Sequence, residues 1–197
     1  MSRVGKTIIT IPAGVTVEFN NGIVKVSGSQ GTLEQIIKSP ITVKIEDGTV
    51  KVERGNDVAE SRALHGLYNR LIQNMIKGVK DGWTKTLIMN GVGYKAAMKG
   101  EGLTLQLGKA HADEVAGVQG IKFKVCTPQE IAALNLGKDG IGQVVQVSGI
   151  SKELVGSVAS KIRDLRPVEP YHMYGIRYSD ERVIRKESKS GAKGKKK

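Results

Sequence analysis

Hydrophobic and polar residues alternate in four short stretches near the start of the chain, which is the pattern of strands with one buried face. The stretches are Val15–Phe19, Ile23–Val26, Ile41–Ile45 and Val50–Val52. Asn21-Gly22 separates the first pair of stretches, and Asp47-Gly48 separates the second pair. Such dipeptides form tight hairpin turns, because both central residues of the turn need a positive φ. The pattern therefore predicts two β-hairpins.

Apolar residues at three- and four-residue spacing then predict a long helix. Asp57 and Glu60 have the spacing of a capping box at its start, and Gly78 and Gly82 are expected to end it. The predicted buried stripe is made of Leu64, Leu67, Leu71, Ile72, Met75, Ile76 and Val79. We expect the stripe to pack on the first sheet and the opposite face to meet solvent. That opposite face carries Arg62, Asn69, Arg70 and Gln73.

The same order of strands and helix recurs from Trp83 onward. The strand-like stretches are Thr84–Met89, Tyr94–Met98, Leu103–Leu107, Ile121–Val125 and Val145–Val147. Ser151 is expected to cap a second helix, with a buried face of Leu154, Val155, Val158, Ala159 and Ile162. Each helix contains a glycine at the matching place, Gly66 and Gly156, for which a close approach to the sheet is the expected reason. Residues 126–142 interrupt the repeat with one expected helical turn over 131–134 and a loop.

The repeat predicts an α+β fold of two similar domains, each an antiparallel-rich sheet packed against one main helix. We expect the first domain over residues 1–82 and the second over 83–170. Residues 171–197 are expected to form an extended basic arm and tail. Two prolines, Pro167 and Pro170, argue against a continuing helix in front of this arm.

Positive charge is concentrated at the end of the chain. Lys and Arg number 31 against 19 Asp and Glu, which gives a net charge of +12. Residues 182–197 hold eight of the cations and one acid, so this short segment supplies +7 of the total. Basic segments bind polyanions because neutralised phosphates release their counterions. Nucleic acid is the expected partner, and a merely solubilising tail is the alternative.

No pattern typical of catalysis or metal binding occurs in the sequence. The three histidines are scattered, and one cysteine, Cys126, excludes an internal disulfide or a cysteine-cluster metal site. Gly91–Ala96 matches the G-x-G-x-x-A pattern of dinucleotide sites, but Gly100 and Gly102 interrupt the helix that such a site needs. We expect no catalytic residue, cofactor or metal. A nucleotide-binding enzyme that uses Gly91–Ala96 is kept as an alternative.

Aromatic and basic residues are interleaved near the end of the second repeat. Tyr171, Tyr174 and Tyr178 alternate with arginines there: Arg166, Arg177, Arg182 and Arg185. Arginine grips phosphate with a planar fork, and tyrosine stacks on unpaired bases. This composition predicts contact with RNA. The alternative is that the tyrosines pin the arm against the second domain.

Several motifs in this order resemble the L-six family of large-subunit ribosomal proteins over nearly the whole chain. They are Met1–Lys6, Ile11–Val15, Arg62–Leu67, Leu71–Met75, Gly91–Ala96, Glu169–Tyr171 and Gly175–Tyr178. The resemblance implies duplicated α+β domains and a structural role on large-subunit rRNA near the sarcin–ricin loop, close to the stalk base and to the docking region of translational GTPases. The rRNA-binding candidates are Tyr94, Lys95, Arg166, Tyr171, His172, Tyr174, Gly175, Arg177, Tyr178, Arg182, Arg185 and Lys186.

The resemblance also implies the partners and the location of the protein. The expected partners are rRNA, neighbouring large-subunit proteins and nearby translational GTPases, with no membrane and no homo-oligomer. The expected location is the ribosome of the cytoplasm, with an organelle matrix or stroma as alternatives. A free-standing RNA-binding module is the second functional alternative.

The chain departs from the family pattern at the start of the arm. His172, Met173 and Tyr174 stand where the family has Lys-Gly-Lys, so two fixed charges and a flexible glycine are missing. The preceding proline is at 167, where the family pattern places it at 168, and the 126–142 insert is longer than usual. These changes put the phosphate contacts of the arm in question.

Overall fold

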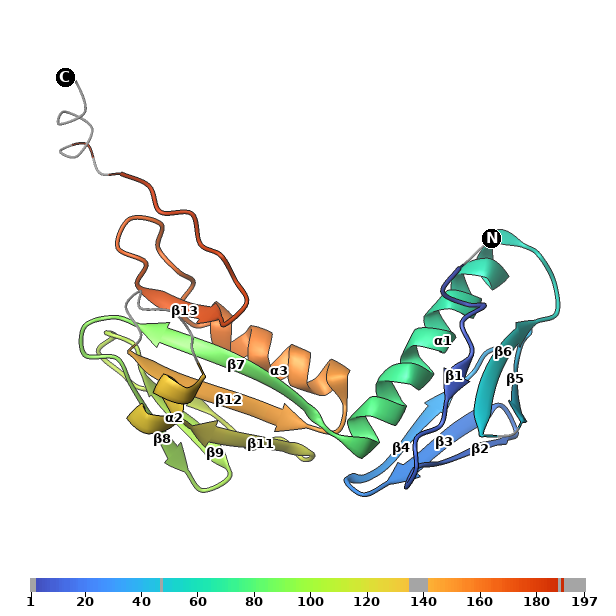
Figure 1. Cartoon of the computed structure of the whole chain (residues 1–197). Coiled ribbons are helices and arrows are strands. Elements are labelled where there is room, and N and C mark those ends of the chain that lie inside the picture. The colour runs from blue at the N-terminus through green and yellow to red at the C-terminus, as the bar shows by residue number, and fades with distance from the viewer. Residues whose placement is uncertain (1–2, 47, 135–141, 188, 190–197) are drawn as a thin grey trace. The chain divides into compact units, whose positions relative to one another are not determined.

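The computed structural model describes residues 3–46, 48–134, 142–187 and 189 (Figure 1). Asp47 of the second predicted turn, residues 135–141 of the predicted loop and the final lysines of the basic tail lie outside the described residues. The chain divides into two compact units. The first contains Met1–Trp83 with Gly149–Lys152, and the second contains Thr84–Ser148 with Glu153–Lys197.

The first unit holds two antiparallel three-stranded sheets and one long helix, α1 (Ala59–Lys80). One sheet has the order β2-β3-β4, and the other has the order β1-β6-β5. The strands are β1 (Ile9–Thr10), β2 (Thr16–Asn20), β3 (Ile23–Gly28), β4 (Gly31–Ile36), β5 (Ile41–Glu46) and β6 (Thr49–Arg54). Helix α1 packs across β3, β4 and β6.

Both predicted hairpins are present. Asn20 pairs with Ile23 across a two-residue turn, in which φ is 50° at Asn21 and 78° at Gly22. Glu46 pairs with Thr49 across the second turn. The sequence pattern did not predict β4, because Gly31–Ile36 has no fully buried face.

The predicted capping box of α1 is wrong. Val58 is the residue before the helix and makes no side-chain cap, while the Asp57 carboxylate lies 2.8 Å from the Arg54 guanidinium. Asp57 therefore pairs with the preceding strand β6 and does not cap the helix.

The buried face of α1 contains four residues of the predicted stripe, Ile72, Met75, Ile76 and Val79, but it differs from the prediction at its N-terminal half. Leu67 is 51% exposed, whereas Tyr68 and Asn69 are buried. The backbone N–H of Lys38 donates to the Tyr68 hydroxyl at 3.1 Å, and Asn69 Nδ2 donates to the carbonyl oxygen of Thr7 at 2.8 Å. These polar groups can be buried because each has a partner.

Gly78 lies inside α1 and does not end it. A Cβ atom at this position would overlap the carbonyl oxygen of Ile150 and reach Trp83 Nε1 at 2.9 Å. The helix ends two residues later, and Gly82 follows with φ 78°. Gly156, for which a close approach was expected, has nothing within 4 Å of an added Cβ. The close approach is thus made at Gly78, and the expectation for Gly156 is wrong.

The second half of the chain forms two further sheets, with the orders β11-β12-β7-β13 and β10-β9-β8. The elements are β7 (Trp83–Asn90), β8 (Lys95–Lys99), β9 (Gly102–Gln106), β10 (Asp113–Val115), β11 (Ile121–Val125), α2 (Pro128–Ala133), β12 (Gln143–Gly149), α3 (Lys152–Asp164) and β13 (Gly175–Tyr178). The predicted α+β class with antiparallel strand pairs is confirmed. Helix α2 begins earlier than the expected turn, because Thr127 and Glu130 form a capping box in front of it.

Helix α3 buries four of its five predicted apolar residues. Val155, Val158, Ala159 and Ile162 are buried, and Leu154 is 44% exposed.

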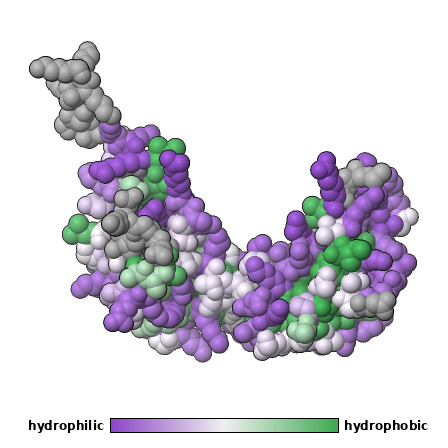
Figure 2. All heavy atoms as spheres, in the orientation of Figure 1, coloured by the Kyte–Doolittle hydropathy of each residue, from purple (hydrophilic) through white to green (hydrophobic). Residues whose placement is uncertain are grey.

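Hydrophilic side chains cover most of the face seen in Figure 2, with hydrophobic ones in smaller patches. Within the described part of the chain, no helix combines the length and the apolarity needed to cross a membrane.

Candidate nucleic-acid interface

Residues 175–178, which lie within the expected extended arm, form a strand of the four-stranded sheet. Strand β13 runs antiparallel to β7, with Gly175 opposite Asn90 and Tyr178 opposite Leu87 (Figure 1). Ile176 between them is fully buried. The candidates Gly175, Arg177 and Tyr178 are therefore held at the edge of a sheet, and the description of this part as an extended arm is wrong.

The segment before β13 is a closed loop, which we call the aromatic loop (residues 167–174). The N–H of Glu169 donates to the carbonyl oxygen of Tyr174 at 2.9 Å, and the N–H of Met173 donates back to Glu169 at 3.0 Å. Met173 has φ 61°, a left-handed conformation that is uncommon for a non-glycine residue. A Cβ at Gly175 would come within 2.6 Å of the Pro167 carbonyl oxygen, so glycine is required there.

Tyr94 and Arg166 come from distant parts of the sequence and meet beside this loop. Arg166 Nε donates to the Tyr94 hydroxyl at 3.2 Å. The Tyr94 ring packs directly against Gly91. A Cβ atom at Gly91 would lie 2.6 Å from the ring, so a larger residue there would displace it. Arg166 is exposed, and its guanidinium has no other partner in the described part of the chain. Lys95, the next candidate, is exposed at the start of β8.

Tyr178 is enclosed by charged neighbours that the sequence pattern did not mark as site residues. Its ring centre lies 5.2 Å from Lys85 Nζ and 5.6 Å from the Arg163 guanidinium carbon. Arg163 also makes two hydrogen bonds to Glu181, at 2.6 and 3.0 Å. The Arg163 hydrogen bonds hold the pKa of the Glu181 carboxyl below its usual range. These contacts favour the alternative in which Tyr178 pins the chain against its own unit.

The remaining candidates lie on or next to the aromatic loop. Tyr171, His172 and Tyr174 are exposed, and the rings of His172 and Tyr174 are stacked with centres 5.6 Å apart. Arg185 Nε donates to the Tyr171 carbonyl oxygen at 3.1 Å, and the Lys186 N–H donates to that of Pro170 at 2.9 Å. The side chains of Arg182, Arg185 and Lys186 are exposed. The structure thus brings aromatic rings and cations together along residues 166–187.

Gly91–Ala96 does not form a dinucleotide site. The segment leads from β7 into β8 and opens no helix, whereas the phosphate group of a dinucleotide needs a helix N-terminus. Among the described residues, no cluster of metal-ligating side chains is present. The Cys126 thiol is buried, and burial raises its pKa, which disfavours the reactive thiolate.

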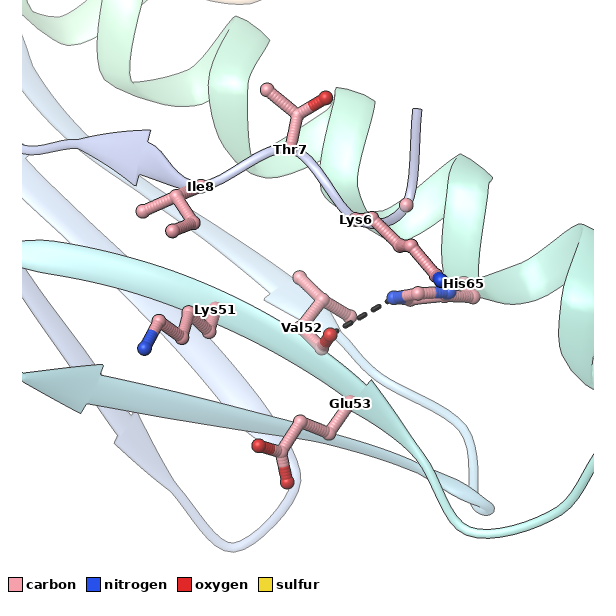
Figure 3. A pocket seen from close by; sticks show the side chains of 8 residues that line it. Lys6, Thr7, Ile8, Lys51, Val52, Glu53 and His65 are labelled. Carbon is pink, nitrogen blue, oxygen red and sulfur yellow. Dashed lines mark hydrogen bonds between the residues drawn. The ribbon is translucent and has the colours of Figure 1, made fainter. Parts of the chain in front are cut away.

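A pocket in the first unit is lined by the N-terminal segment, β6 and α1 (Figure 3). His65 of α1 is only 5% exposed, and its Nε2 lies 2.9 Å from the Val52 carbonyl oxygen. Its Nδ1 lies 3.3 Å from Arg54 Nη1. Asn69 Nδ2 donates to Gly5 and Thr7 of the N-terminal segment. The polar groups of His65 and Asn69 are used to hold β6 and the N-terminal segment on the helix, which is a structural role.

Comparison with known proteins agrees with this architecture. The model of a family described as ribosomal protein L6 matches residues 11–82 and 90–179. The chain belongs to this family. The two matched segments correspond to the two similar halves seen in the sequence and the structure. The family consists of structural ribosomal proteins, so the alternative of a nucleotide-binding enzyme is wrong.

Curated relatives match over nearly their full length. A large ribosomal subunit protein uL6 from Clostridium perfringens is 46% identical over 192 residues, which cover 97% of this chain and 99% of the relative. Proteins of the same name from Streptococcus suis and Fusobacterium nucleatum are 44% and 43% identical over 191 and 189 residues. These alignments cover 97% and 96% of this chain and 99% of each relative.

Proposed function

We propose that the chain is a structural component of the large ribosomal subunit that binds large-subunit rRNA through the aromatic loop, the following basic segment (residues 182–187) and the Tyr94–Arg166 pair. The observation that supports this most directly is the Arg166 guanidinium, held by Tyr94 and exposed beside the loop. Tyr94, Lys95, Arg166, Tyr171, His172, Tyr174, Arg182, Arg185 and Lys186 are the proposed contact residues. Gly175, Arg177 and Tyr178 hold these residues in place through β13.

Arginine suits this position for a physical reason. The guanidinium has five donors in a rigid plane, and one of them is used by the Tyr94 hydroxyl. That hydrogen bond restricts the orientation of the guanidinium group, and the remaining N–H donors stay available for a phosphate. Less side-chain freedom is then lost when RNA binds, so each phosphate contact is stronger.

Family membership and the positive charge of the chain support a more specific proposal about its place in the subunit. We propose contact with rRNA beside the sarcin–ricin loop, with proteins of the stalk base as neighbours and translational GTPases docking nearby. The protein would act there as a single copy in the ribosome. The basic segment gives no support for a membrane partner, because Ile184 is its one strongly exposed large apolar residue among those described.

Salt dependence of rRNA binding tests the proposed contact. The full chain would be titrated with large-subunit rRNA transcribed in vitro at several salt concentrations. Arg166→Ala should weaken binding and lower the slope of log affinity against log salt by about 0.7–0.9, the contribution of one phosphate. Arg70→Ala is the matched control, because Arg70 is an exposed arginine on α1 that donates to Gln73. Equal slopes for both variants would contradict the phosphate contact.

Cross-linking tests the proposed location. A photoreactive amino acid would replace Tyr171, an exposed residue of the aromatic loop, in the full chain incorporated into ribosomes. Cross-links to nucleotides in or next to the sarcin–ricin loop would support the location. Cross-links only to a distant rRNA domain would contradict it, even if the protein remains in the subunit.

A further inference from the structure

Two exposed aromatic rings lie nearly parallel in the aromatic loop. The ring centres of His172 and Tyr174 are 5.6 Å apart, and the planes differ by 19°. Tyr174 is 39% exposed although it is a large aromatic residue, and His172 is also exposed. In a folded protein, an aromatic ring of this size is usually more deeply buried. The pair therefore offers a flat π surface to solvent.

The loop holds these rings in place before any partner binds. Hydrogen bonds between Glu169 and Tyr174, and between Met173 and Glu169, close the loop on itself. Asn90 Nδ2 of β7 donates to the Met173 carbonyl oxygen at 3.3 Å, which ties the loop to the sheet. Binding to a surface that is already ordered costs less conformational entropy than binding to a flexible one.

The charges around the pair favour a base over a phosphate at this spot. The Glu169 carboxylate lies 3.2 Å from His172 Nδ1 and 3.4 Å from the His172 backbone nitrogen. A carboxylate this close repels a phosphate that would approach the imidazole. Arg185 Nε and the backbone N–H of Lys186 donate to the carbonyl oxygens of Tyr171 and Pro170, so the cations that can meet phosphates lie beside the two residues that precede His172.

We propose that the His172–Tyr174 pair binds one unpaired nucleobase of RNA by stacking, while Arg185 and Lys186 contact the phosphates next to that base. The inference rests on the proposed rRNA binding and specifies how one part of the interface works. Stacking on aromatic side chains tolerates any base, because every base has a π face. It requires a base outside a helix, since paired bases already stack on their neighbours.

The test compares ring chemistry at one position in the full chain. Tyr174→Leu keeps an apolar side chain but removes the ring, and it should weaken binding to in vitro transcribed large-subunit rRNA by about five- to a hundredfold with an unchanged salt slope. Tyr174→Phe keeps the ring and should bind within about twofold of the unsubstituted chain. Thermal unfolding of each variant shows whether the fold is retained.

A second measurement detects the stacked base itself. The probe is a short single-stranded RNA that contains one fluorescent aminopurine, compared with the same strand in a duplex. The unsubstituted chain should quench the single strand and not the duplex, and Tyr174→Leu should lose the quenching. Equal quenching by Tyr174→Leu, or unchanged rRNA affinity of a folded Tyr174→Leu, would overturn the stacking site alone. Failure of the unsubstituted chain to bind rRNA would overturn the proposed function as well.

Discussion

Arg166 Nε donates a hydrogen bond to the Tyr94 hydroxyl at 3.2 Å, although the two residues are 72 positions apart. The tyrosine comes from the turn between β7 and β8, and the arginine lies two residues after the end of α3. Neither residue has a catalytic partner in the described part of the chain. The contact sets the direction of a positive charge at the surface, which is what an RNA-binding structural protein needs.

The double-mutant cycle of Tyr94 and Arg166 is the first prediction. Tyr94→Phe keeps the ring and removes the hydroxyl, so Arg166 loses its fixed position but keeps its charge. We expect rRNA affinity to fall by about 0.5–1.5 kcal/mol with an unchanged salt slope. In an Arg166→Ala background, Tyr94→Phe should have almost no effect. Additive effects of the two substitutions would show that Tyr94 does not act through Arg166.

Two helix glycines provide a second prediction with opposite signs. Gly78→Ala should lower the free energy of unfolding by about 1–3 kcal/mol, because the added methyl group overlaps the Ile150 carbonyl oxygen. Gly156→Ala should raise it by about 0.5–1 kcal/mol, because the helix gains a better helix-forming residue and the space is open. Urea unfolding of both variants measures the difference. The same sign for both would contradict the packing described at Gly78.

The third prediction is that Tyr178 contributes to the stability of the fold and not directly to rRNA binding. The ring contacts Lys85 and Arg163, and the residue belongs to the edge strand β13. Tyr178→Ala should lower the free energy of unfolding by about 1–3 kcal/mol. Among variants that remain folded, the salt slope of rRNA binding should not change. A normal unfolding curve together with a large loss of rRNA affinity would instead place Tyr178 in direct contact with RNA.

The Arg163–Glu181 pair predicts a pH dependence of stability. Arg163 lowers the pKa of the folded Glu181 carboxyl, whereas an unfolded glutamate titrates near pH ~4.3. The stabilisation is therefore fully present above about pH 4.3 and is lost as the pH falls through the lower folded pKa. Glu181→Gln should cost about 1 kcal/mol at neutral pH, and the cost should shrink in acid.

Unfolding by urea at neutral pH and at about pH 3 tests this linkage. Glu18→Gln is the control, because it removes an exposed carboxylate on β2, a strand of the first unit, and leaves the Arg163–Glu181 pair of the second unit unchanged. A Glu181→Gln effect that is the same at both pH values would rule out the charged pair as its cause.

Local signals in the sequence were sufficient for much of the fold. Asn21-Gly22 predicted a hairpin because both residues take positive φ, and that conformation is observed. Spacing alone predicted the buried Ile72, Met75, Ile76 and Val79 of α1 but not the buried polar residues beside them. Tyr68 and Asn69 are buried because Lys38 and the N-terminal segment supply their hydrogen-bond partners, and these partners are remote in sequence.

The sequence predicted which residue types make up the candidate interface, but it could not predict which side chains contact one another there. Interleaved arginine and tyrosine pointed to residues 166–186 as the candidate segment, because both residue types suit RNA, and RNA contact by this segment stays a prediction. The sequence could not show that Arg163 and Tyr178 are engaged with Glu181 and Lys85, nor that Tyr94 reaches Arg166. Those relationships depend on β13 pairing with β7, a long-range contact without a local signal.

Sedimentation of ribosomal subunits tests the central claim most directly. Large subunits from cells that express the tagged chain would be washed in high salt and separated on a gradient. A structural component should remain with the large subunit at one copy per particle, because many contacts hold it in the assembled rRNA. Release of the chain into the supernatant, or a copy number far below one, would contradict the claim and favour a free-standing RNA-binding module.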